Sequence, residues 1–359
     1  MYKYSHGGNA AFESGNEDII DLSANINPLG IPDKVRDAII GEIPRILAYP
    51  DSSSGKLRKK LAEFENVDPD WLFCGNGASD IIFRLPRVLQ AEKVLITAPT
   101  FSDYERAADS FGSKIIYHAL SAANAFDMDK GFIDAVQAEK PDLVYICNPN
   151  NPTGRLTDAR FIKDLLDSCR ENEAFLAVDE CFLEFTEKAE DCTSKDFLSD
   201  YPKLVILKAF TKLFTMPGVR LGYAICSDPA IIDSFYFHGP DWPVSNLAQA
   251  AGIAALDDAD RFVRATVEYV SKQRKHIENE LSKLGCRTFE SSANYVFFQS
   301  PFSFDLREEL NKEGIRIRSC SNYRALDDSY YRIAVSTEEN NAKLLSAMEK
   351  IAASRQLMN

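Results

Sequence analysis

Short apolar runs alternate with helix-like segments from about Asp70 to Cys226. The apolar runs predict seven strands: WLFCG, KVLITA, KIIYH, DLVYIC, FLAVD, LVILKA and LGYAIC. Amphipathic helices are predicted between some of them, in GASDIIFRLPRVL, SDYERAADSF and DARFIKDLLDSCREN. Parallel strands need crossover connections of this kind, which cover both faces of a sheet. The pattern therefore predicts an α/β fold with a mostly parallel, doubly wound sheet.

The pattern changes in the last third of the chain. A long charged helix is predicted from Asp260 to Leu284, followed by the apolar runs ANYVFFQS, GIRIRS and YYRIAVS and a closing helix from Glu338. We expect a smaller α+β domain over residues 258–359 and a large domain over residues 33–257. Residues 1–32 are rich in Gly and Asn, and we expect them to form an arm that packs near the small domain.

Length, charge and cysteine usage narrow the functional class. A chain of 359 residues is long enough for two unequal domains with their own cores. The formal net charge of -13 argues against a nucleic-acid partner, whose phosphates demand a basic surface. No secretory leader or membrane-length apolar run is evident, so we expect a cytoplasmic protein without a membrane partner. The eight cysteines are scattered without CxxC pairs, so neither a metal site nor disulfides are expected.

Ligands of open α/β sheets bind beyond the carboxyl ends of the strands, so polar residues there are candidates for a site. Gly77, Ala78 and Ser79 of GNGASD follow one strand and open a helix, whose free N–H groups suit a phosphate. A plain turn is the alternative. Phe101 of TAPTFSDY could cover a flat cofactor ring, or it could simply pack. Each of these signals alone is modest.

Three further strand ends carry more specific signals. Asn151 of NPNNPTG lies in a fixed extended loop, where its amide could bond a phenolic oxygen. Asp179 ends an apolar run, and a buried carboxylate needs a cationic partner such as a protonated pyridine nitrogen, unless it caps a helix or joins a salt bridge. Lys212 follows another strand, and Arg220 could hold a phosphate and lower the pKa of this lysine. These residues follow one another at successive strand ends, and a chance occurrence of the whole set in this order is improbable.

These residues in this order resemble the fold-type I enzymes that use pyridoxal 5'-phosphate (PLP), the aspartate aminotransferase superfamily, over essentially the whole chain. The resemblance implies that Lys212 forms a Schiff base with PLP, Asp179 pairs with its pyridine nitrogen, Asn151 contacts its ring hydroxyl oxygen and Phe101 stacks on its ring. It also implies that Tyr49 of LAYPD reaches the phosphate from the other subunit of a homodimer. The remaining phosphate ligands would be Gly77, Ala78, Ser79 and Arg220, with Thr211 nearby.

Two groups in this superfamily resemble the chain most: histidinol-phosphate aminotransferases and the threonine-phosphate decarboxylases of cobalamin biosynthesis. The segments similar to the decarboxylase pattern are HGGN (6–9), LSANINPLG (22–30), IRSCSNY (317–323) and YYRIAVS (330–336). Phe182 of DECF favours the same group, because the aminotransferases usually carry tyrosine there. Ala209 departs from the superfamily, which commonly has a hydroxyl residue at this position for the phosphate, and we expect weaker cofactor binding from this loss.

The resemblance thus implies PLP-dependent decarboxylation of O-phospho-L-threonine to (R)-1-amino-2-propanol phosphate. Arg332 matches the superfamily arginine that grips the substrate carboxylate, and Arg318 is a candidate for the substrate phosphate. Surface salt bridges are the alternative for both arginines. His6 and Asn27 of the arm are expected to close over the small phosphorylated substrate.

Three other functions stay open at this point. An aminotransferase acting on a phosphorylated substrate such as histidinol phosphate would use the same cofactor machinery. A decarboxylase of serine phosphate would differ by one methyl group, worth only about 1 kcal/mol in a pocket. A non-catalytic PLP-binding module is less favoured, because such regulators carry an N-terminal DNA-binding domain and the residues before the first predicted helix are too few for one.

Overall fold

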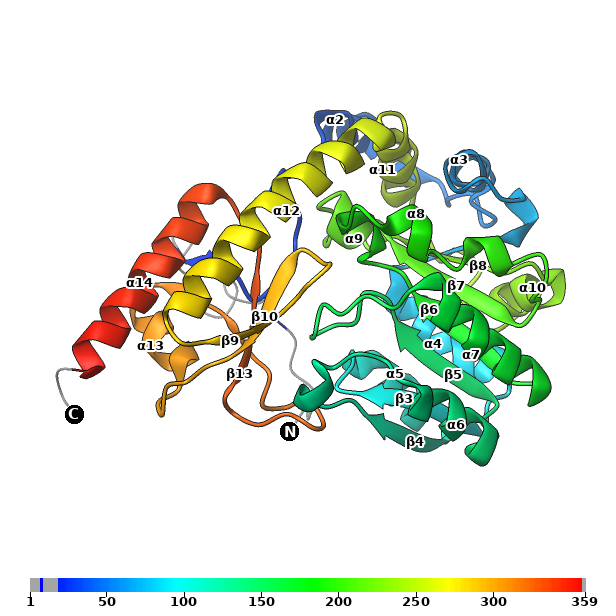
Figure 1. Cartoon of the computed structure of the whole chain (residues 1–359). Coiled ribbons are helices and arrows are strands. Elements are labelled where there is room, and N and C mark those ends of the chain that lie inside the picture. Colours follow the sequence, from blue (N-terminus) through cyan, green and yellow to red (C-terminus); the bar gives the residue numbers. More distant parts are fainter. Residues whose placement is uncertain (1–6, 9–18, 357–359) are drawn as a thin grey trace.

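The computed structural model describes residues 7–8 and 19–356, which form a large sheet and a smaller one connected by the long helix α12 (Ala259–Lys283) (Figure 1). The large sheet has seven strands in the order β2-β8-β7-β6-β5-β3-β4. All seven predicted strands are present, and the mostly parallel α/β architecture is confirmed. The strands are β2 (Leu72–Gly75), β3 (Lys93–Ala98), β4 (Lys114–Ala119), β5 (Leu143–Cys147), β6 (Phe175–Asp179), β7 (Leu204–Ala209) and β8 (Gly222–Ile225).

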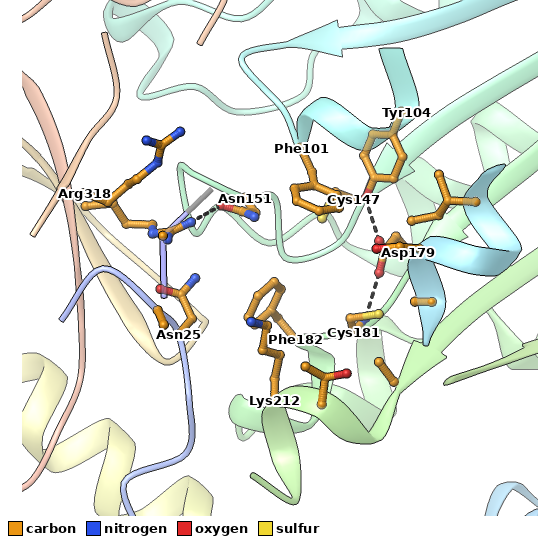
Figure 2. Close-up of a pocket in the computed structure, with 18 of the residues that line it drawn as sticks. Asn25, Phe101, Tyr104, Cys147, Asn151, Asp179, Cys181, Phe182, Lys212 and Arg318 are labelled. Atoms are coloured by element: carbon orange, nitrogen blue, oxygen red, sulfur yellow. Dashed lines mark hydrogen bonds between the residues drawn. The ribbon is translucent and has the colours of Figure 1, made fainter. Parts of the chain in front are cut away.

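Strand β8 is the one antiparallel member of the described large sheet. It follows β7 after only the short helix α9 (Phe210–Leu213) and a loop, and it pairs Lys208 with Tyr223. Antiparallel neighbours need no crossover helix, so the chain can return directly. Lys212 therefore lies in the connection at the carboxyl end of β7, near Asp179 at the end of β6 (Figure 2).

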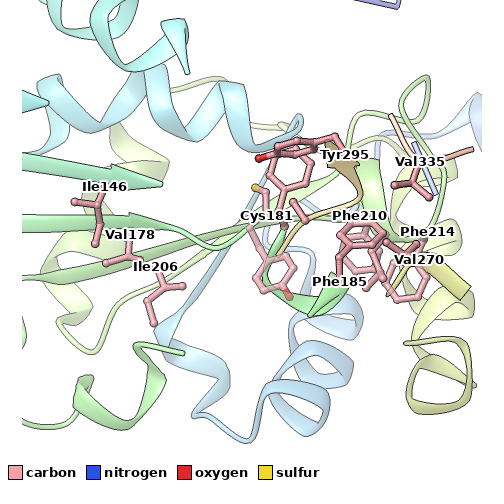
Figure 3. Close-up of a cluster of buried hydrophobic side chains, with 14 of the residues drawn as sticks. Ile146, Val178, Cys181, Phe185, Ile206, Phe210, Phe214, Val270, Tyr295 and Val335 are labelled. Carbon is pink, nitrogen blue, oxygen red and sulfur yellow. The ribbon is translucent and has the colours of Figure 1, made fainter. Parts of the chain in front are cut away.

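Helices cover both faces of the large sheet, as the alternating pattern predicts. Strand β5 is buried throughout, with Tyr145 packed toward one layer of helices and Ile146 toward the other. Figure 3 shows Ile146 beside Val178 and Ile206 of the neighbouring strands, on the second face. The first face packs on α4 (Ala78–Val88), α5 (Ser102–Phe111) and α10 (Pro229–Phe237), and the second on α3 (Gly55–Glu65), α6 (Lys130–Glu139) and α7 (Ala159–Glu171).

The C-terminal part contains a four-stranded antiparallel sheet in the order β12-β13-β10-β9. Its strands are β9 (Arg287–Phe289), β10 (Tyr295–Gln299), β12 (Arg318–Ser319) and β13 (Tyr330–Ala334). The helices beside it are α12, α13 (Leu306–Lys312) and α14 (Glu338–Gln356).

The apolar run GIRIRS is divided between two sheets. Its first half, β11 (Ile315–Arg316), pairs in parallel with β1 (Ile20–Asp21) from the N-terminal segment. Its second half, β12, pairs with β13 in a register that sets Arg318 directly opposite Arg332. Residues paired in this way have neighbouring side chains on one face of the sheet. The division therefore places Arg318 and Arg332 side by side in the small sheet.

The remaining helices are α2 (Asp33–Glu42), α8 (Ala189–Cys192) and α11 (Asn246–Leu256). Helix α2 packs against α11 at the end of the large sheet. An apolar cluster between the two sheets contains Phe185, Phe210, Phe214, Val270, Tyr295 and Val335 (Figure 3). Among the described residues, no helix combines the length and apolar character that crossing a membrane requires.

Candidate active site

A cavity of about 900 Å³, its open mouth included, lies at the carboxyl ends of β5, β6 and β7. The large sheet, the small sheet and the N-terminal segment all contribute to its lining. Figure 2 shows Asp179 on one side of this space and Arg318 on the other, with Lys212 between them. The predicted site residues that line it are Ala78, Ser79, Phe101, Asn151, Asp179, Thr211, Lys212, Arg220, Arg318 and Arg332.

One end of the cavity has the features of a phosphate cradle. Helix α4 begins here, and the first N–H groups of a helix have no partner within it. Gly77 precedes the helix with φ of +83°, and a Cβ there would come within 2.6 Å of Arg220 Nη2. A Cβ at Gly222 would lie 2.4 Å from the Ala78 nitrogen, so glycine lets β8 approach the helix start. These residues fit a bound phosphate group, and Ala209 lines the same cavity without a hydroxyl.

Lys212 is half-buried and points into the cavity (Figure 2). Burial lowers the pKa of Lys212 to about 8, and the positive charges of Arg332 and Arg220 act in the same direction. A substantial fraction of its amine is therefore neutral near physiological pH, the form that can attack a carbonyl carbon.

Asp179 is 5% exposed and accepts hydrogen bonds on both carboxylate oxygens. The Tyr104 hydroxyl donates to Oδ2 at 2.6 Å, and the Cys181 backbone N–H donates to Oδ1 at 3.0 Å. Burial raises the pKa of Asp179, while the bonds from Cys181 and Tyr104 lower it. A cationic group in the cavity would favour the ionised form further, which fits a protonated ring nitrogen.

The sequence reasoning missed Tyr104. The signal was its position three residues after Phe101, since residues at this spacing share one face of a helix. The two rings meet edge to face, with centroids 5.7 Å apart. Cys147 and Cys181 also line the cavity beside Asp179 and were not singled out, because a buried cysteine is ordinarily a packing residue.

Arg332 links three segments of the chain. Its Nη1 donates to Asn151 Oδ1 at 2.5 Å, and its Nη2 donates to the Ser23 carbonyl at 2.7 Å. Its buried Nε has no partner among the described residues. Arg318 donates to Asn322 Oδ1 at 2.8 Å, and its guanidinium lies 5.5 Å from the Tyr323 ring centroid. Both arginine side chains line the cavity.

The N-terminal segment reaches the cavity through a different asparagine from the one predicted. Asn27 is not among the lining residues, because its amide donates at 2.8 Å to both the Leu213 carbonyl and Thr266 Oγ1. Asn25 lines the cavity instead, and its buried Oδ1 has no partner within the described part of the chain. His6 lies outside the described residues.

Tyr49 is far from buried, at 78% exposure, and stacks on Trp242 with ring centroids 4.2 Å apart. It does not line the cavity of its own chain. Its predicted contact with the phosphate of another subunit stays a prediction.

No group of three His, Cys, Asp or Glu side chains within residues 7–8 and 19–356 is arranged to hold a metal ion.

The chain is similar in sequence and in structure to known aminotransferases and decarboxylases. A family model described as "Aminotransferase class I and II" matches residues 17–348. A threonine-phosphate decarboxylase from Salmonella typhimurium is 32% identical over 358 residues, covering 98% of this chain and 97% of that protein. A histidinol-phosphate aminotransferase from Methanocaldococcus jannaschii is 30% identical over 341 residues, covering 93% and 90%. The crystal structure of the histidinol-phosphate aminotransferase from Clostridium acetobutylicum has a TM-score of 0.87 at 32% identity, covering 94% of this chain and 100% of that one.

Proposed function

The chain belongs to the class I and II aminotransferase family and is a PLP-dependent enzyme of this kind, and on that premise we propose that it decarboxylates O-phospho-L-threonine to (R)-1-amino-2-propanol phosphate. The chemistry of the cavity supports the substrate class. The reaction type draws support from the similarity to the Salmonella typhimurium decarboxylase and from the segments described above.

The observation that carries the proposal is the pairing of two guanidinium groups on one face of the small sheet. Arg318 and Arg332 lie opposite each other in the β12–β13 ladder, across the cavity from the phosphate cradle at α4. A phosphorylated amino acid carries two anionic groups, a carboxylate and a phosphate, and each guanidinium can bind one of them through two parallel N–H bonds. We assign the carboxylate to Arg332 and the phosphate to Arg318, and Asn25 is a third candidate contact.

PLP, when bound, supplies a conjugated ring that accepts the electron pair left at the substrate Cα. The chain would hold it through the residues of the cradle, through Asn151, and through Asp179, whose carboxylate would keep the ring nitrogen protonated. Phe101 would cover the ring. Lys212, with its pKa of about 8, would hold the cofactor through its amine and would carry the proton that returns to Cα.

Orientation decides which bond to Cα breaks, because only the bond perpendicular to the ring overlaps with its electron system. Arg332 and Arg318 would fix that orientation by holding the two ends of the substrate. Phe182 lines the cavity and has no hydroxyl to offer the ring oxygen, and its ring packs edge-on against Tyr295 with centroids 5.2 Å apart. This environment supports a decarboxylase over an aminotransferase.

An aminotransferase acting on a phosphorylated substrate such as histidinol phosphate is the second candidate. It is favoured by relatives of that activity that are about as similar to the chain as the decarboxylases are. Arg332 would then bind the carboxylate of a keto acid in the second half of the reaction. A decarboxylase of serine phosphate is a third possibility, since the substrates differ by one methyl group.

We also infer a homodimer in which Tyr49 contacts the cofactor phosphate of the partner. Large apolar side chains are exposed on α2, on the turn after it that leads to Tyr49, at the end of α10 and in the segment after α10, and extended apolar patches of this kind mark interfaces. They are Ile40, Ile43, Ile46, Leu47, Phe237 and Trp242, with exposures from 45% to 94%. We retain the division into an arm (1–32), a large domain (33–257) and a small domain (258–359) as part of this proposal.

The deciding experiment incubates the PLP-loaded enzyme with O-phospho-L-threonine, O-phospho-L-serine or histidinol phosphate, each with 2-oxoglutarate, and follows carbon dioxide and glutamate together. Carbon dioxide from O-phospho-L-threonine without glutamate is the expected result. Glutamate without carbon dioxide would replace the proposal by the aminotransferase. Carbon dioxide from O-phospho-L-serine alone would keep the reaction and change the substrate.

A further inference from the structure

Tyr104 lies in the first turn of α5, is completely buried, and directs its hydroxyl at the carboxylate of Asp179 (Figure 2). The bond to Asp179 Oδ2 is 2.6 Å long. Its ring stacks on Tyr145, with centroids 4.9 Å apart and planes 14° from parallel, and Phe101 meets it edge-on. The hydroxyl is therefore held in place by packing on two sides.

We propose that Tyr104 is a positioning residue that keeps the Asp179 carboxylate charged and aimed at the ring nitrogen of PLP. This inference rests on the proposed pairing of Asp179 with that nitrogen. Tyr104 itself acts through Asp179.

The reasoning starts from the cost of a buried carboxylate. Burial raises the pKa of Asp179 and so favours its neutral form, which could not hold a proton on the ring nitrogen. Hydrogen bonds donated to a carboxylate favour the charged form. Tyr104 supplies the bond to one oxygen and the Cys181 N–H supplies the bond to the other. Losing either bond therefore weakens the pairing.

The other ionisable groups around Asp179 do not replace Tyr104. Burial raises the pKa values of Cys147, Cys181 and Tyr145, so these groups stay neutral. Asp103 raises the pKa of Asp179 through its negative charge. Burial also raises the pKa of Tyr104 well above its usual range, so the phenol keeps its proton and remains a donor.

Tyr145 provides a matched control within the same stack. It is as buried as Tyr104, at 1% exposure, and sits on β5, where it pairs with Ala177 two residues before Asp179. Its hydroxyl donates to the Ile82 carbonyl at 3.3 Å instead of to Asp179. A Tyr→Phe substitution at either position removes one buried hydroxyl and keeps the stacked ring, so a difference between the two variants reports on the bond to Asp179.

The test compares wild-type enzyme, Tyr104→Phe and Tyr145→Phe in two measurements that need no substrate. One is the affinity of the apoprotein for PLP, and the other is the pH midpoint at which the visible absorbance of bound PLP changes. Tyr104→Phe should weaken PLP binding about tenfold, the usual loss for a hydrogen bond to a charged group. Tyr104→Phe should also raise the pH midpoint of the absorbance change. A PLP ring with less positive charge repels a second positive charge less, so the rest of the conjugated cofactor keeps its proton to a higher pH. Tyr145→Phe should leave both quantities near the wild-type values.

An Asp179→Asn background shows whether Tyr104 acts through the aspartate. There, adding Tyr104→Phe should change PLP affinity less than twofold, since the charge that the hydroxyl stabilises is gone. Equal effects of Tyr104→Phe and Tyr145→Phe, or a tenfold effect that persists in the Asp179→Asn background, would overturn the proposal. If Tyr104→Phe alone does not fold, recovery of folded protein in the double variant supports the coupling, and its continued absence contradicts it.

These measurements are independent of the proposed reaction. If the enzyme proves to be an aminotransferase, the PLP affinities and absorbance midpoints still decide the role of Tyr104. If Tyr104→Phe and Tyr145→Phe behave alike while carbon dioxide is released from O-phospho-L-threonine, only the inference about Tyr104 fails.

Discussion

Asp179 and Arg332 are both ionisable and buried, on opposite sides of one cavity, but they are held in different ways. Asp179 is supported entirely from the large sheet and its helices, with a donor on each oxygen. Arg332, on the small sheet, reaches across to Asn151 in the large-sheet part and to Ser23 in the N-terminal segment. Its Nε, like Asn25 Oδ1, has no partner among the described residues.

The Asp179 carboxylate is therefore fully bonded before any ligand arrives, whereas the substrate side retains buried polar atoms without partners among the described residues. Buried polar atoms without partners are costly, so a ligand that satisfies them gains binding free energy. The substrate side is also assembled from the two ends of the chain, around residues 23–25 and around residues 318–323 and 332 of the small sheet. We expect substitutions on the cofactor side to affect chemistry and stability most, and those on the substrate side to affect substrate recognition.

The largest effect is expected from Lys212→Ala, which removes the proposed proton carrier. Turnover should fall by at least about 1,000-fold, within the range of general acid–base catalysis. Borohydride reduction should fix PLP to the wild-type protein and not to the variant, as measured by intact mass. Lys163→Ala, at a surface lysine paired with Asp167, is the control and should behave as wild type. Turnover within tenfold of wild type would contradict the role of Lys212.

A buried ion cluster beneath the cofactor side gives the second prediction. Lys208 on β7 is 5% exposed, and its Nζ lies 2.5 Å from Glu184 Oε1, 3.2 Å from Glu65 Oε1 and 3.8 Å from Glu180 Oε2. Burial alone would lower the pKa of Lys208, but the three carboxylates raise it.

Lys208→Met should therefore lower the free energy of unfolding by about 3–5 kcal/mol, because it leaves Glu180 and Glu184 without their cation, while Glu65 keeps its ion pair with Lys195. Chemical denaturation of the PLP-bound protein measures this loss. Lys203→Met, at a lysine bonded to the Glu173 carbonyl on the surface, should cost less than about 1 kcal/mol. A similar loss in the two variants would show that the cluster does not stabilise the cofactor side.

Arg332→Met tests the substrate side. It removes the proposed carboxylate contact, and kcat/KM for O-phospho-L-threonine should fall about 100-fold, the usual cost of truncating a buried charged partner. Arg332→Lys should recover only part of the loss, since an ammonium cannot make the two-pronged bond. If Arg332→Met stays within threefold of wild type, the substrate carboxylate binds elsewhere.

Much of the architecture could be predicted because its signals are local. Periodicity placed all seven strands of the large sheet and its principal helices, and the order of Asn151, Asp179 and Lys212 followed from the strand ends. The periodicity of apolar residues does not tell in which direction a strand runs, so the antiparallel direction of β8 could not be predicted. The division of GIRIRS depends on partners around residues 20 and 332, and no local pattern reports those contacts.

The site was predictable to a similar degree. Most of the residues predicted at strand ends line the cavity, because the fold fixes where those ends meet, whereas Gly77 is not among the lining residues. In the irregular N-terminal segment, no periodicity tells which asparagine faces inward, and the structure selects Asn25 over Asn27. Tyr104 was missed because its importance depends on a hydrogen bond to a strand 75 positions away.

The low pKa of Lys212 links the two sides of the cavity and gives a prediction for pH. Only the neutral amine attacks PLP, so the rate of PLP incorporation into the apoprotein should rise with pH, with a midpoint of about 8. Arg332→Met removes a positive charge that lowers this pKa, so its midpoint should move upward. Stopped-flow absorbance at several pH values measures both. Arg324→Met, which removes a charge from outside the cavity lining, should leave the midpoint unchanged.

The smallest effect is expected where the loop after β12 touches the large-sheet part. The Arg324 guanidinium lies 3.9 Å from the ring centroid of Tyr117 on β4, and its Nη2 donates to Glu105 of α5 at 3.4 Å. The neighbouring Tyr323 lines the cavity, so this contact steadies one wall of the substrate side.

Arg324 is 52% exposed, and contacts of exposed cations with rings and carboxylates are each worth about 1 kcal/mol or less. Arg324→Met should therefore raise KM about threefold and leave kcat and PLP affinity unchanged, because Arg324 touches neither the cradle nor Lys212. Arg307→Met removes a comparably exposed ion pair, with Asp305 within the small-sheet part, and should leave KM as it is. A fall in kcat with an unchanged KM would instead mean that the loop acts on the cofactor side, and the two sides of the cavity would then be less independent than their hydrogen bonds indicate.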